Sequence, residues 1–498
     1  MGRAILRRVF HCSASALSVE SPAPAPGVTF MNTFRLLLCS LLLSLHAVAD
    51  DGPPLFIEGY AANLSTAPGE ELAFHVSTSA PKFAVEIVRW GLKNEVVWTK
   101  KDFSGQAHAV PEDAAAMGCR WPETFRVPIG KGWKSGYYTA RFSIEDRGGK
   151  WTRRGRRTAE SEACFVVRAA EPGVRSKILL QLCTNTYNAY TNWGGFSVYG
   201  FHGLGKNQGS RVSFERPLSS QFARWEMPFV QWCERNGIAL DYATNADLEF
   251  RPELLKNYRL VLSVGHDEYW STPMRDHLEA FIAKGGNVAF FSGNSVCWQI
   301  RSEDEGRAFT CWKQHYMADP VFQTRDFKTL STAWSHHLVA RPENQLTGVG
   351  FLWGGYRHSH GQFIGEPAEY TVHQPEHWVF EGTQIKRGEK FGAHDSIVGY
   401  ETDGCELEWR DGLPFATHRD GTPETFTVLG TCPVRWHPDD CEWYERWEKG
   451  RTGAACMGIY TRGGTVFTAA TTDWSHGLRG GDKTVERITR NVIERLSK

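Results

Sequence analysis

The sequence lacks an excess of either charge and lacks any apolar run long enough to span a membrane. Lys plus Arg and Asp plus Glu number 56 each among 498 residues. A chain without a basic surplus has no electrostatic footprint for nucleic acid or an anionic membrane. No segment reaches the ~20 consecutive apolar residues of a transmembrane helix. We therefore expect a protein with no nucleic-acid partner and no membrane span.

Cysteines at the CxxC spacing of a structural zinc site are also missing. Two of the 12 cysteines, Cys12 and Cys39, precede Ala49, and we expect disulfides among some of the others. Cys297 follows a polar loop but does not lie on a sharp G-x-C-x-G turn. We therefore expect Cys297 to be buried or bridged, and not to be a nucleophile.

The first fifty residues have the features of an export signal. From Met31, Arg35 precedes the apolar run Leu36–Leu45, and small residues follow up to Ala49. This pattern predicts a signal peptide that is cleaved after Ala49. Residues 1–30 then lie upstream of an internal start, although their Arg-containing opening also resembles a transit peptide. We expect a secreted or periplasmic mature chain.

The sequence predicts three regions: an upstream extension and signal over residues 1–49, a β-sandwich over 50–172, and an α/β domain over 173–498. Apolar residues alternate or run together in segments typical of strands in the second region. These segments are Leu72–Val76, Phe83–Val88, Thr124–Val127 and Tyr138–Ile144. In the third region, apolar periodicity also predicts helices over 221–236 and 483–496. The pattern does not assign the region from 302 to 389.

One strand, helix and strand unit organises the third region. Residues 258–262 form an apolar run, Thr272-Pro273 has the chemistry of a helix start, and Gly285-Gly286 ends that helix. A second apolar run follows over 287–291. Such a unit is a parallel crossover, and ligands bind beyond the carboxyl ends of parallel strands.

Polar residues follow each of these two strands. His266 and Glu268 come after the first, and Asn294 after the second. We therefore expect the three side chains to converge on one crevice. An HxE pair alone is equally compatible with a buried histidine bonded to a carboxylate and with a metal site. Tyr187 and Tyr190 follow the first strand of the domain, and Glu401 offers a further carboxylate.

Several ordered motifs resemble the N,N-dimethylformamidase large (β) subunit family. They are TYNAY with WGG, GHDEYW, GGN with AFFSGN, GYETDG and GTVFTAATTDW. The resemblance covers about residue 60 to the C-terminus. It implies an immunoglobulin-like domain followed by a domain with the class I glutamine amidotransferase-like (flavodoxin-like) fold.

The resemblance also implies a mononuclear Fe3+ held by two tyrosines and a glutamate. Carried over, the glutamate is Glu268, one tyrosine is Tyr190 with Tyr187 as the alternate, and the other tyrosine is Tyr138. A core position in its strand explains Tyr138 equally well. Phenolate and carboxylate oxygens are hard donors suited to a ferric ion, whereas Zn2+, the alternative metal, prefers imidazole or thiolate.

By the same resemblance, the catalytic residues are Glu401, His266 and Asn294. Glu401 would take a proton from water, and the other two would orient it or stabilise an oxyanion. We expect a secreted metal-dependent hydrolase of C–N bonds in small amides. Such an enzyme could form a homo-oligomer. The alternative is a non-catalytic exported carbohydrate-binding or surface protein that keeps the fold.

Overall fold

The computed structural model describes residues 55–146, 157–357, 368–436 and 452–498. Residues Pro53–Lys498 form one unit. The expected signal peptide and the rest of region 1–49 lie outside the described residues. The fold is mixed α/β with a β-rich N-terminal region, as the sequence predicts. No helix among the described residues is long and apolar enough to cross a membrane.

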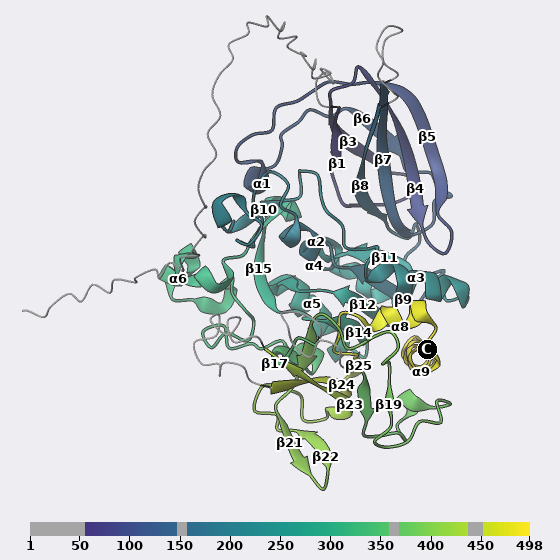
Figure 1. The fold of residues 1–498 in the computed structure, drawn as a ribbon, viewed down its shortest axis with the longest axis vertical. Coiled ribbons are helices and arrows are strands. Elements are labelled where there is room, and N and C mark those ends of the chain that lie inside the picture. The colour runs from purple at the N-terminus through teal and green to yellow at the C-terminus, as the bar shows by residue number, and fades with distance from the viewer. Residues whose placement is uncertain (1–54, 147–156, 358–367, 437–451) are drawn as a thin grey trace, which may run out of the picture. The chain divides into compact units, whose positions relative to one another are not determined.

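Two sheets share one apolar core in the N-terminal region (Figure 1). One sheet has the order β1 (Ile57–Ala61), β3 (Glu71–Thr78), β6 (Phe125–Pro128). The other has the order β2 (Ser65–Thr66), β8 (Arg157–Val167), β7 (Gly136–Asp146), β4 (Lys82–Trp90), β5 (Glu95–Ser104). In β4, Val85 and Ile87 are buried while Glu86 between them is exposed. This alternation directs every second side chain into the core and confirms the predicted strands.

A nine-stranded sheet forms the centre of the remaining chain. Its order is β11 (Asp241–Thr244), β9 (Ile178–Leu182), β12 (Leu260–His266), β14 (Asn287–Gly293), β25 (Gly464–Thr468), β24 (Thr452–Arg462), β23 (Thr427–Arg435), β18 (Tyr370–Val372), β19 (Lys390–Phe391). Pairings from β11 to β25 are parallel, and those from β25 to β19 are antiparallel.

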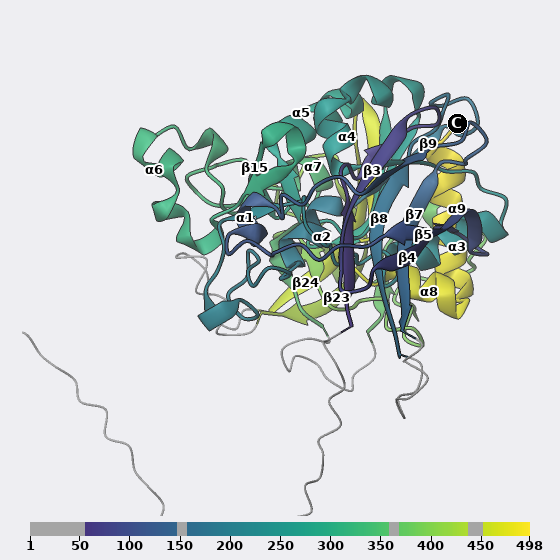
Figure 2. The same cartoon turned by 90° about the horizontal axis from the view of Figure 1, so that it is seen from above.

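Helices cover both faces of this sheet. The core that contains Leu180 and Leu262 includes side chains of α3 (Glu226–Arg235), α8 (Trp474–Gly480) and α9 (Lys483–Leu496). The core that contains Leu179 and Val261 includes side chains of α4 (Asn245–Phe250) and α5 (Thr272–Ala283). Figure 2 shows α8 and α9 together, away from α4 and α5. Consecutive strand residues therefore enter opposite cores, as expected for a buried parallel sheet.

The predicted crossover is present with small shifts at its ends. Ser271 caps α5, because its hydroxyl accepts a hydrogen bond from the Met274 N–H, and Pro273 occupies the first turn. Gly285 follows the helix with a φ of 93°. The helix predicted over 221–236 begins later, at Glu226, whereas α9 has the predicted bounds.

Short elements complete the described chain. A four-stranded sheet has the order β10 (Arg211–Ser213), β16 (Ala308–Thr310), β15 (Trp298–Glu303), β13 (Tyr269–Ser271). There are also two two-stranded sheets. One pairs β17 (Gly350–Gly355) with β20 (Thr402–Gly404), and the other pairs β21 (Leu407–Arg410) with β22 (Leu413–Ala416). The short α-helices are α1 (Ala114–Met117), α2 (Thr184–Tyr190), α6 (Pro320–Thr324) and α7 (Asn344–Thr347). Single 3-10 segments are η1 (Leu204–Lys206), η2 (Pro252–Asn257), η3 (Asp304–Gly306), η4 (Lys313–Ala318), η5 (Phe327–Thr329) and η6 (Trp378–Phe380).

The cysteines correct one expectation. All nine cysteines within the described ranges are free and buried, so the expected disulfides are not formed among them. They fill positions in several separate apolar cores, where a thiol packs as a small hydrophobic side chain. Cys297 is buried as predicted, and burial raises the pKa of its thiol well above the usual range.

Candidate active site

Two neighbouring parallel strands deliver the first site residues. His266 ends β12 and is in register with Gly293 at the end of β14. Gly265, just before His266, has a φ of 84°, and a Cβ there would lie 2.4 Å from the Cβ of Trp225. Only glycine fits this close approach, which brings Trp225 against His266 with ring centroids 5.3 Å apart.

Glu401 reaches the same point from much later in the chain. Its backbone N–H donates to the Thr472 hydroxyl, and the Thr472 N–H donates to the Glu401 carbonyl. A Cβ at Gly293 would lie 2.5 Å from that carbonyl oxygen. The absence of a side chain at Gly293 therefore allows Glu401 to lie beside the end of β14.

The four predicted polar residues meet in one buried cluster. His266 Nε2 lies 2.7 Å from Glu401 Oε2 and 3.2 Å from Glu268 Oε2. Asn294 Nδ2 donates to Glu401 Oε2 at 3.2 Å. The residues are at most 4% exposed. The convergence expected from the crossover is therefore present, and it includes Glu401.

A tyrosine that the sequence analysis did not single out contacts the Glu268 carboxylate. The Tyr199 hydroxyl donates to Glu268, lying 3.0 Å from Oε1 and 3.0 Å from Oε2. The Tyr190 ring packs 4.4 Å from the Tyr199 ring. The Trp298 indole N–H donates to Glu268 Oε1 at 2.7 Å. Two phenols and one carboxylate thus lie together beside His266.

The other two tyrosines lie elsewhere. Tyr138 is fully buried in the N-terminal core, where its hydroxyl donates to the Lys134 carbonyl at 2.7 Å and its ring stacks on Phe165. The structure therefore does not bring Tyr138 to Glu268, because its strand position points it into the sandwich. Tyr187 is also buried and donates to the Glu226 carboxylate. Of the alternates, Tyr190 belongs to the cluster.

A buried cation borders the phenols. Lys313 Nζ lies 3.1 Å from the Tyr269 hydroxyl, and that hydroxyl donates to the Tyr199 hydroxyl at 2.6 Å. The same ammonium lies 3.4 Å from the centre of the Tyr199 ring and 4.6 Å from that of Trp298. Lys313 therefore stabilises negative charge on Glu268.

The charges of the cluster shift its pKa values in opposing directions. Burial disfavours a charged imidazole, but Glu401 and Glu268 outweigh burial and raise the pKa of His266 to about 10. Burial alone would raise the pKa of Glu268, yet His266 and Lys313 hold it below its usual range. Burial, followed by the charge of Glu268, raises the pKa of Tyr190 and of Tyr199 well above normal. A cationic His266 thus faces anionic Glu268 at neutral pH.

Two polar atoms in the cluster remain available. His266 Nδ1 and Asn294 Oδ1 are buried and have no hydrogen-bond partner within the described part of the chain. Unpaired buried polar atoms are costly, so they commonly mark a place where a ligand or water binds. The half-buried rings of Tyr190, Tyr199 and Tyr400 adjoin these groups and provide the border with solvent.

The donor types restrict the kind of metal that could be held here. No group of three or more His, Cys, Asp or Glu side chains in the described ranges has metal-binding geometry. Any site at Glu268 would therefore draw on phenol oxygens. Such a hard, oxygen-rich set fits a trivalent ion better than zinc.

Tyr199, Lys313 and Trp298 complete this cluster, and no periodic pattern identified them. Tyr199 lies in an irregular segment between α2 and η1, and Lys313 begins η4. A tyrosine within the glycine-flanked stretch GFSVYGFHG was the available signal for Tyr199. Trp298 follows Asn294 by four residues at the start of β15.

Comparison with known proteins places the chain in a family. Residues 84–487 match the family model described as "N,N-dimethylformamidase beta subunit-like, C-terminal". Curated relatives named "N,N-dimethylformamidase beta subunit" come from Paracoccus aminophilus and Alcaligenes sp; each is 24% identical over 453 residues. Each alignment covers 76% of this chain and 55% of the relative, so the chain spans about half the length of those relatives.

A solved structure of the sporulation control protein Spo0M from Bacillus subtilis aligns with 25% of this chain over 52% of its own length, at 11% identity and a TM-score of 0.17. The match over residues 84–487 spans most of the chain and includes every member of the buried cluster. The chain belongs to the N,N-dimethylformamidase beta subunit-like family.

Proposed function

We propose that the protein is a metal-dependent hydrolase of C–N bonds in small linear amides. The observation that carries the proposal is the contact of both Glu268 carboxylate oxygens with the Tyr199 hydroxyl, beside Tyr190 and next to His266 and Glu401. Relatives named as subunits of N,N-dimethylformamidase support an amide as the substrate class.

The proposed metal ligands are Tyr190, Tyr199 and Glu268, and Tyr199 replaces Tyr138 in the set that the family resemblance implies. Three anionic oxygen donors match the charge of Fe3+, and Zn2+ is the alternative. When bound, such an ion supplies Lewis-acid polarisation of a carbonyl oxygen. Lys313, 3.4 Å from the Tyr199 ring centre, favours the ionised form of that phenol.

The remaining residues divide the proton and charge chemistry. Glu401 is the proposed base that takes a proton from water, since it is the carboxylate of the cluster that does not contact Tyr199. His266 Nε2 and Asn294 Nδ2 hold Glu401 in place at 2.7 and 3.2 Å. The unused Nδ1 of the cationic His266 is available to donate to a developing oxyanion.

The burial of so many charges favours an enzyme over a non-catalytic binding protein. Glu268, Glu401, His266 and Lys313 are all at most 4% exposed. Removing such groups from water costs several kcal/mol for each ion unless partners offset it. A protein that only displays a surface gains nothing from this arrangement, whereas catalysis requires it.

The finer fold assignment and the location of the protein are part of the proposal. The two sheets with a shared core are compatible with an immunoglobulin-like sandwich, and the parallel half of the nine-stranded sheet with a glutamine amidotransferase-like domain. The apolar run after Met31 supports export with cleavage after Ala49. The word "subunit" in the relatives' names supports an oligomer, either of this chain alone or with another chain.

Elemental analysis of the purified protein, combined with an amide panel, tests the proposal. We expect about one iron per chain, a visible colour from phenolate-to-iron charge transfer, and hydrolysis of some formamides or acetamides. Glu268→Ala should lose the ion. A colourless protein that holds zinc would overturn the iron assignment, and an iron-loaded protein inert toward every amide would overturn the reaction class.

A further inference from the structure

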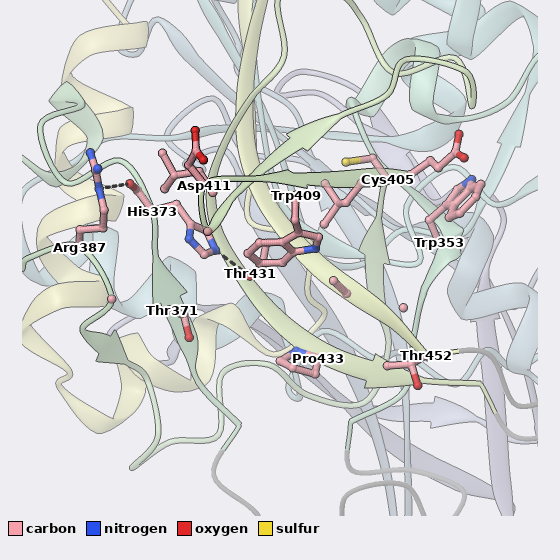
Figure 3. Close-up of a pocket in the computed structure, with 17 residues that line it drawn as sticks. Trp353, Thr371, His373, Arg387, Cys405, Trp409, Asp411, Thr431, Pro433 and Thr452 are labelled. Atoms are coloured by element: carbon pink, nitrogen blue, oxygen red, sulfur yellow. Dashed lines mark hydrogen bonds between the residues drawn. The ribbon is translucent and has the colours of Figure 1, made fainter.

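A groove separate from the buried cluster has a cavity volume of about 720 Å³. Its floor is the antiparallel end of the nine-stranded sheet, where Thr371, Thr431 and Pro433 line it from neighbouring strands β18 and β23. Its wall is the hairpin of β21 and β22 (Figure 3). The volume lies in the range of ~300–1,000 Å³ that is typical of ligand sites. None of His266, Glu268, Asn294 and Glu401 lines it.

The hairpin presents an exposed indole to this groove. Trp409 is 58% exposed and lines the groove together with Leu407, two residues before it on the same face of β21. On the opposite face, the Arg410 guanidinium lies over the Phe415 ring at 5.4 Å. The protein thus covers one exposed aromatic ring with its own cation and leaves the other open. A large exposed aromatic ring in a concave site indicates a binding surface.

Contacts with the floor hold this indole in place. The Trp409 ring lies edge-on to the His373 ring, with centroids 5.8 Å apart and an interplanar angle of 80°. His373 Nε2 is 2.8 Å from the Thr431 hydroxyl, and its backbone N–H donates to the Leu429 carbonyl. The Asp411-Gly412 turn has positive φ at both residues, which suits a tight hairpin. The aromatic wall is therefore formed before any ligand arrives, which lowers the entropy cost of binding.

The polar groups of the groove do not favour a ligand of either charge. The charged side chains that line it are Arg387, Asp411 and Glu406, and the Arg419 guanidinium pairs with the Glu406 carboxylate. Arg387 and Asp411 carry opposite charges, and Arg387 Nε donates to the His373 carbonyl at 3.1 Å. Burial, then the charge of Arg387, lowers the pKa of His373 to about 4, so the imidazole is neutral. The hydroxyls of Thr371, Thr431 and Thr452 line the same space. This balance offers no attraction to a polyanion or a polycation.

We propose that this groove binds a neutral oligosaccharide. A sugar ring has one apolar face of C–H groups and a rim of hydroxyls, which are both donors and acceptors. The Trp409 indole matches the apolar face, and the threonine hydroxyls, Arg387 and Asp411 match the rim. The site is an accessory one, and it stands independently of the proposed amide hydrolysis.

Titration calorimetry of the full exported chain with neutral hexasaccharides tests the proposal. The probes are cello-, xylo-, manno- and maltohexaose, with an acidic uronic acid hexamer for comparison. We expect at least one neutral probe to bind and Trp409→Ala to weaken that binding ~10-fold or more. Trp409→Phe should restore part of it. The matched control, Phe415→Ala, removes an aromatic ring from the other hairpin face and should leave affinity unchanged.

Asp411→Asn is the second variant, because asparagine tolerates positive φ and keeps the turn. It should weaken binding while circular dichroism and melting temperature stay unchanged, even if Trp409→Ala disturbs the hairpin. The proposal is overturned if no neutral probe binds at millimolar concentration, if the acidic hexamer alone binds, or if Trp409→Ala and Asp411→Asn both bind like the unaltered chain. A change in sedimentation of Trp409→Ala without any sugar binding would also overturn it, in favour of a protein interface.

Discussion

The Tyr199 hydroxyl lies 3.0 Å from both carboxylate oxygens of Glu268. This contact joins the irregular segment between α2 and η1 to the loop that follows β12. It brings a phenol to Glu268, the carboxylate of the HxE pair in the sequence. Tyr138, to which the family resemblance assigns the same role, instead donates to the Lys134 carbonyl inside the N-terminal core. Replacing each tyrosine in turn should therefore affect iron binding differently.

Tyr199→Phe should reduce iron content and weaken or shift the visible absorption, because it removes one of three proposed oxygen donors. Tyr138→Phe is the matched control, since it removes one phenol oxygen outside the cluster. It should leave iron unchanged and lower the free energy of unfolding by ~1 kcal/mol, the usual contribution of one hydrogen bond. Iron content and absorption spectra of both variants test this. The reverse pattern would return Tyr138 to the ligand set.

Tyr190→Phe and Tyr187→Phe form a second pair within one helix, α2. Tyr190 lies against Tyr199, and we expect its loss to change the colour. Tyr187 donates to Glu226, whose pKa is raised to about 7 mainly by burial. Its replacement should lower the melting temperature, because Glu226 loses a buried hydrogen-bond donor, and should spare the colour. A colour change in Tyr187→Phe alone would contradict the assignment.

The parallel crossover explains why part of the site could be predicted. Strands that lie side by side in parallel end at one edge, so the loops after β12 and β14 had to bring His266, Glu268 and Asn294 together. The helix between the two strands could also be predicted, because Pro273 and Gly285 mark its two ends. These features depend on residues that lie close together in the sequence, so a sequence pattern can predict them.

The rest of the site depends on contacts between distant segments. Glu401 is held through Thr472, and Tyr199 lies in an irregular stretch without periodicity. The sequence offered Glu401 as a further carboxylate, only the resemblance to a family gave it a role, and nothing indicated Lys313. For Tyr138, the alternation of β7 explained a position in the core as well as the resemblance explained a role as metal ligand. The core position is the one observed. Period-two patterns predict which face a residue occupies and not its chemical role.

A buried carboxyl outside the site should make stability depend on pH. Glu343 is fully buried, and burial raises its pKa to about 8. The carboxyl therefore stabilises the fold fully below the unfolded pKa of 4.5, and this stability is lost as pH rises toward 8. The slope should be at most ~1.4 kcal/mol per pH unit in that window. Glu343→Gln keeps the oxygen that accepts the Phe351 N–H, and denaturant titrations should show a flatter profile.

We predict that the protein is exported and that the mature chain begins near Asp50. The apolar run after Met31 and the small residues before Asp50 predict cleavage there. N-terminal sequencing of protein collected outside the cytoplasm tests this, with an Ala49→Arg variant to block cleavage. A secreted product that retains residues 1–30 would show the prediction to be wrong.

Glu401→Gln separates catalysis from metal binding. The variant keeps the shape of the side chain and removes only the basic oxygen, and Glu401 contacts His266 and Asn294 while Tyr199 contacts Glu268. We expect unchanged folding and iron content, with amide hydrolysis reduced by ~100-fold or more, as for loss of a general base. The measurement is iron per chain and hydrolysis rate on the same preparation of Glu401→Gln and unaltered protein. Full iron with the rate lost is the predicted result, whereas loss of the iron, or full iron with an undiminished rate, would contradict it.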